Sequence, residues 1–136
     1  MPERAANLRA DLILKAMIAV ASADAGGLED SEISLMQQVY EDQAERPITP
    51  EEIAEVSQSS TRDGLLAELS AASPVLDRET KEEIIRAAYL TLLADGRIAA
   101  EERKKLQDIA MALRVPEIHF GAILEDLALW LEEQKS

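Results

Sequence analysis

The chain has 136 residues, of which 14 are basic and 27 acidic, so its net charge is −13. A field of this sign repels phosphate backbones and anionic lipid, which argues against nucleic acid as a partner and favours cations or a basic protein surface. The absence of cysteine excludes disulfides, thiol catalysis and zinc–thiolate sites. The length suits one domain.

Apolar residues make up 47% of the chain and aromatic residues only 3%. Strand-forming residues are few and do not alternate with polar ones, so we predict an all-α, single-domain bundle of about seven helices over residues 1–136. The apolar run 12–23 contains Lys15 and lacks a cleavage site, which argues against a secretory signal. It is also shorter than the about 20 residues that span a bilayer. A cytoplasmic protein without membrane insertion is expected.

The first predicted helix covers about residues 2–24 and is apolar nearly all round from Leu12, which is typical of a helix at the centre of a bundle. Asp24 and the glycines that follow end it. A second helix, about 30–45, is expected to keep Glu32 in solvent. Thr49 caps a short third helix that reaches about Ser57. A fourth helix covers about 62–72.

Asp77 is predicted to cap a fifth helix that ends at Asp95 and has little polar surface in its second half. A sixth helix covers about 100–113, and Pro116 opens the last one. This last helix is expected to bury Phe120, Leu124, Leu127 and Leu131. Trp130 is expected in the core, whereas an exposed Trp there would indicate an interface.

The two halves of the chain match in order. The matched pairs are Asp24 with Asp95, Leu28 with Ile98, Glu32 with Glu102, Met36 with Leu106, and Val39 with Ile109. We therefore predict an internal duplication, with one half at about 8–58, a connecting helix at about 61–73 and the other half at about 77–134. The two apolar helices would pack back to back as a shared core.

Both turns carry an Asp, a Gly, an aliphatic residue and a Glu four positions after the aliphatic one. If the turns share one edge of the bundle, Asp24, Glu32, Asp95 and Glu102 form a site for calcium or magnesium, which prefer oxygen ligands. A bound divalent cation would relieve the mutual repulsion of these carboxylates. An EF-hand is excluded, because its first ligand positions would fall inside an apolar helix. The alternative interpretation, that these residues only cap helices, stays open.

Other polar features indicate no catalytic site. His119 is the only histidine, so it has no partner for a triad or a histidine-based metal site, and it is expected in solvent. The basic run 103–105 is expected to be a solvated face. The acidic run 41–55 is read as a solvated face, with attraction of a basic partner as the alternative. We therefore expect a protein that is not an enzyme.

The turn LADGRIAAEE at 93–102, and less closely ADAGGLEDSE at 23–32, resembles the TerB-like family of tellurite-resistance proteins. The likeness covers about residues 12–127. It implies a seven-helix bundle with two similar halves, no known catalysis, roles in stress response and metal sensing, and Asp24, Glu32, Asp95 and Glu102 as the acidic positions. The first copy departs from the family pattern at Ala25 and by one inserted residue.

Two functional hypotheses follow from the sequence. The first is a non-enzymatic TerB-like protein that binds a divalent cation. The alternative is a protein–protein interaction module that uses an acidic or apolar groove and binds no metal. A protein partner and a homo-oligomer are both compatible with the sequence.

Overall fold

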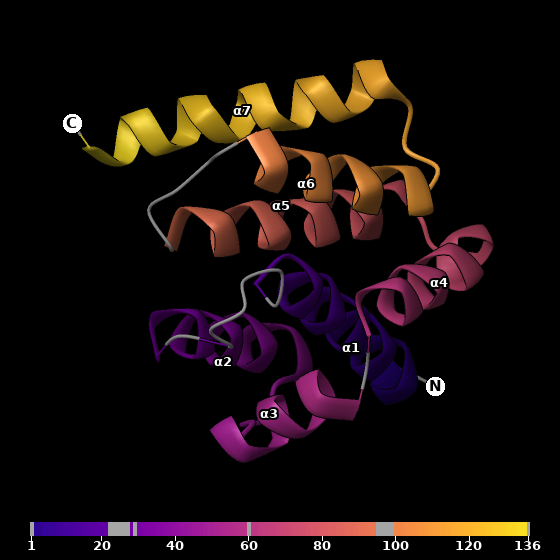
Figure 1. The fold of residues 1–136 in the computed structure, drawn as a ribbon, viewed down its shortest axis with the longest axis vertical. Helices are drawn as coiled ribbons and strands as arrows, with labels where there is room; N and C mark the ends of the chain where they lie inside the picture. Colours follow the sequence, from indigo (N-terminus) through magenta and orange to yellow (C-terminus); the bar gives the residue numbers. More distant parts are fainter. Residues whose placement is uncertain (1, 22–27, 29, 60, 95–99, 136) are drawn as a thin grey trace.

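A computed structural model describes the chain except residues 1, 22–27, 29, 60, 95–99 and 136, which are grey in Figure 1. The side chains of residues 2–7, 62, 94, 100–102, 134 and 135 are also outside the description. The described helices are α1 (Pro2–Ala21), α2 (Asp30–Ala44), α3 (Pro50–Ser59), α4 (Arg62–Ala72), a 3₁₀ turn (Ser73–Val75), α5 (Arg78–Ala94), α6 (Ala100–Ala112) and α7 (Glu117–Lys135). All regular structure in the described residues is helical, which confirms the all-α prediction.

Helix α1 is the centre of the core. Every residue from Leu12 to Ala21 except Lys15 is buried, because this stretch has no continuous polar face to turn toward water. It packs against α2, α4, α5 and α6, and most extensively against α5. The contact between the two apolar helices agrees with the expected shared core, whereas the internal duplication itself stays a prediction.

The remaining helices lie on either side of this α1–α5 pair. Helix α2 packs on α1 and carries α3, whereas α6 packs on both α5 and α1. Figure 1 shows α7 along the outer edge of the bundle. The contacts of α7 with other helices are made mainly to α5 and α6. None of the described helices is long and apolar enough to cross a membrane.

Local capping explains where several helices begin. At α3, the amide of Glu52 donates to Thr49 Oγ1 at 3.1 Å and the amide of Thr49 donates to Glu52 Oε1 at 3.2 Å, which is a reciprocal capping box. At α5, Asp77 Oδ1 accepts from the amide of Thr80 at 2.8 Å. Both predicted caps are confirmed. Helix α3 extends to Ser59, two residues beyond its predicted end.

Two helices end with a non-glycine residue in the left-handed conformation. These residues are Glu45 after α2, with φ of 57°, and Arg114 after α6, with φ of 60°. At the end of α6, the amides of Val115 and Arg114 donate to the carbonyls of Ala110 and Met111 at 2.9 and 3.0 Å. This is a Schellman motif, whose left-handed position normally carries glycine.

The burial pattern corrects three predictions from the sequence. Glu32, expected in solvent, is only 5% exposed. Trp130, expected in the core, is 49% exposed. In α7 the buried stripe is Phe120, Ile123 and Leu127, whereas Leu124 and Leu131 are only partly buried. The stripe is narrow because α7 contacts the bundle along one side and leaves its other faces in solvent.

Candidate functional site

The four predicted cation ligands fall largely outside the described part of the chain. Asp24 and Asp95 are not described, and for Glu102 only the main chain, at the start of α6, is described. Glu32 is buried in the first turn of α2. No group of three or more Asp, Glu or His side chains placed to hold a metal ion exists among the described residues. The cation site therefore stays a prediction.

An apolar groove lies between the second halves of α5 and α7. Its volume is about 510 Å³, and it is lined by Arg86 and Leu90 of α5 and by Asp126, Leu127 and Trp130 of α7. Residues three or four positions apart share one face of a helix. The spacing therefore places both α5 residues on one wall and the three α7 residues on the other.

The groove combines a buried floor with an exposed aromatic side chain. Leu127 is 4% exposed, whereas Trp130 is 49% exposed. Arg86 also lines the groove, and it donates through Nη1 to Glu83 Oε1, one turn earlier on α5, so part of its charge is already neutralised. Trp is enriched among the residues that contribute most to binding at protein interfaces, because it buries a large area and keeps one polar N–H.

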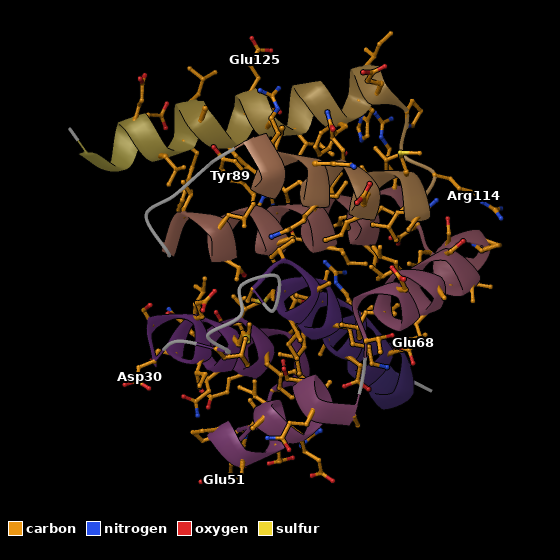
Figure 2. The ribbon with its side chains drawn as sticks, in the orientation of Figure 1. Asp30, Glu51, Glu68, Tyr89, Arg114 and Glu125 are labelled. Carbon is orange, nitrogen blue, oxygen red and sulfur yellow. The ribbon has the colours of Figure 1, made fainter. Side chains whose placement is uncertain are left out.

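The helix that carries Trp130 is acidic. Its sequence contains five carboxylates, Glu117, Glu125, Asp126, Glu132 and Glu133, against one Lys. Figure 2 shows Glu125 pointing away from the bundle on the outer side of α7. Of these carboxylates, Asp126 lines the groove, and together with the net charge of −13 it favours a basic ligand.

A second polar cluster joins the beginnings of α5 and α7. Arg78 Nη2 lies 2.9 Å from His119 Nδ1, and His119 Nε2 lies 3.0 Å from Glu82 Oε1. Arg78 Nε also donates to His119 Nε2 at 3.4 Å, so the imidazole lies between the Arg78 guanidinium and the Glu82 carboxylate. His119 is therefore not the solvated side chain expected from the sequence. Its partners lie about forty positions earlier, beyond the reach of local patterns.

A third polar cluster surrounds the hydroxyl of Tyr40, which is buried, whereas its partners Asp11 and Arg46 are exposed. Arg46 Nη2 donates to the Tyr40 hydroxyl, which donates to Asp11 Oδ1 at 3.3 Å. The Arg46 guanidinium also lies 5.1 Å from the ring centroid. Burial, followed by the nearby Asp11 carboxylate, raises the pKa of Tyr40. This cluster ties the end of α2 to α1.

Comparison with known proteins identifies no relative. No protein-family model matches the chain, and no curated protein or solved structure is significantly similar to it. The resemblance to TerB-like proteins therefore stays an expectation from the two turn motifs.

Proposed function

We propose that this protein is a non-enzymatic interaction module whose α5–α7 groove binds a basic amphipathic helix of a partner protein. The observation that carries the proposal is Trp130, half exposed at the wall of an apolar groove on an acidic helix. Exposed apolar side chains are common as isolated residues. Trp130 differs because it lines a cavity together with Leu90 and Leu127.

The groove complements both the apolar face and the basic side chains of such a partner helix. Apolar side chains of the partner helix, spaced three and four residues apart, pack on Leu90, Leu127 and Trp130. Each large side chain that is fully buried contributes about 1.5–3 kcal/mol. Lysines or arginines that flank these anchors face the carboxylates of α7, which accelerates association and selects against acidic segments.

Calorimetric titration with two matched peptides tests the proposal. Both peptides carry leucines at amphipathic helical spacing, and their remaining positions are lysine in one and glutamate in the other. The lysine peptide is expected to bind and the glutamate peptide not to bind, because only the first complements the charge of α7. Equal binding of the two peptides would show that charge does not select the ligand, and the proposal would fail.

A pair of neighbouring variants locates the binding surface. Trp130→Ala removes the groove wall and is expected to weaken the lysine peptide at least about tenfold. Leu129→Ala removes an apolar side chain that is 59% exposed and does not line the groove, and its affinity should match that of the unmodified protein. If Trp130→Ala binds as tightly as Leu129→Ala, the groove is not the site.

A further inference from the structure

A second pocket lies at the opposite end of α5 and α7, where both helices begin. Its volume is about 360 Å³, and its lining residues are Arg78, Lys81, Arg114, Val115, Pro116 and His119. Three of the chain's 14 basic residues and its single histidine thus meet at one pocket. None of these lining residues is acidic. In a chain with a net charge of −13, the lining of this pocket is basic, and the nearest carboxylate given by its contacts is that of Glu82, 3.0 Å from His119 Nε2.

The positive charge of this basic pocket is only partly neutralised within the protein. Arg78 is held by His119 and lies with Nε 3.6 Å from Glu82 Oε1, so Glu82 balances its charge. Lys81 and Arg114 make no ion pair or side-chain hydrogen bond with any residue that the structure describes. Two cations at the pocket are therefore left to interact with solvent or with a ligand.

The main chain around the pocket favours an anion as well. The carbonyl of Pro116 accepts the first helical hydrogen bond of α7, from the amide of Phe120 at 2.9 Å, which makes Pro116 the N-cap. Proline has no side-chain oxygen to receive the amides of the first turn, unlike Asp77 at the start of α5. The first-turn amides of α7 therefore have no N-cap side chain as acceptor and are open to an anion, while Glu117 adds one carboxylate to the same turn.

We infer that the basic pocket binds the dianionic phosphate group of a phosphate monoester. Lys81 supplies a point charge, and the Arg114 guanidinium supplies two parallel N–H donors that fit two phosphate oxygens. Figure 2 shows the exposed Arg114 side chain extending away from the bundle, so its guanidinium is accessible to a phosphate from solvent. Small metabolites and phosphorylated serines both carry this group.

Titration with inorganic phosphate, monitored by amide NMR shifts at constant ionic strength, tests the inference. Saturable shifts are expected for residues 78–81 and 114–119, with a dissociation constant in the millimolar range. Free phosphoserine and a phosphoserine peptide are then compared. Equal affinities indicate a small-molecule ligand, and a tighter peptide indicates a phosphorylated protein. Shifts that grow linearly without saturation, or that spread over all basic residues, overturn the inference.

Three variants separate specific binding from loss of charge. Lys81→Gln and Arg114→Gly are each expected to weaken phosphate binding about fivefold. Lys104→Gln removes the same charge from an exposed position of α6 and should leave the affinity unchanged. Arg114→Gly also suits the left-handed backbone of this residue, so its loss of binding cannot be attributed to unfolding. An equal loss in Lys104→Gln would contradict a specific site.

Discussion

The hydroxyl of Ser73 donates a 2.8 Å hydrogen bond to the main-chain carbonyl of Leu113, 40 residues later in the chain. Both residues are buried. Leu113 follows the last residue of α6, where helical carbonyls lack partners within their own helix. The side chain of Ser73 satisfies one of them, and so fixes the turn after α4 to the end of α6.

Ser73→Ala is expected to lower the free energy of unfolding by about 1–3 kcal/mol, because it leaves the carbonyl of Leu113 buried without a donor. Urea denaturation measures the change. Ser59→Ala, at the exposed end of α3, is the control and should stay within about 0.5 kcal/mol of the unmodified protein. Similar losses in the two variants would show that the buried hydrogen bond contributes little.

Glycine at either of the two left-handed positions is predicted to stabilise the protein, in contrast to Ser73→Ala. Arg114→Gly and Glu45→Gly should each raise the free energy of unfolding by about 0.5–1 kcal/mol. The left-handed conformation costs about 1–2 kcal/mol for a residue with a Cβ, and glycine avoids this cost while losing some chain entropy on folding. The urea midpoint should rise with an unchanged slope. A lower midpoint in both variants would show that neither backbone is strained.

Asp77 makes stability depend on pH in the acid range. Its hydrogen bonds from Thr80 lower the pKa of this carboxyl in the folded protein. Because the pKa of Asp77 is lower in the folded protein than in the unfolded chain, where it is about 3.9, the ionised carboxylate stabilises the folded protein at pH values above about 3.9. This stability is lost as the pH falls through the folded pKa. Asn still caps a helix but does not titrate here. The stability difference between the unmodified protein and Asp77→Asn should therefore shrink between pH 5 and pH 2.5, and a constant difference would contradict this role.

The predicted cation site is tested by titration with calcium and then magnesium. If the two turns bind a cation, amide NMR signals next to Asp24 and Asp95 shift saturably at millimolar metal, and Asp95→Asn abolishes the shifts. Helix capping alone predicts no saturable change. In that case the acidic turns serve only to end one helix and begin the next.

The helical architecture was predictable because its signals are local. The stretch that forms α1 has no polar face, which predicts a buried helix. The caps at Thr49 and Asp77 depend on residues only three positions away. The predicted bounds of most helices therefore lie within three residues of those observed. Glu45 and Arg114 gave no such signal, since neither is the glycine that usually follows a helix.

The candidate sites were less predictable because they depend on packing between distant segments. The groove exists only because the second half of α7 lies beside α5, and the exposure of Trp130 depends on that packing. Likewise, His119 meets Arg78 and Glu82 only where two helices begin side by side. The sequence favours the core for Trp130 because a tryptophan lies more often in a core than at an interface, and only the position of α7 at the edge of the bundle shows that this side chain is half exposed.

The fluorescence of Trp130 tests the proposed function most directly, because it is the only tryptophan in the chain and lines the groove. Addition of the lysine-rich amphipathic peptide should shift its emission saturably to shorter wavelength, since the half-exposed indole becomes shielded from water. The glutamate-rich peptide should leave the spectrum unchanged. An emission maximum that stays fixed while calorimetry records binding of the lysine peptide would place the binding surface elsewhere and contradict the account.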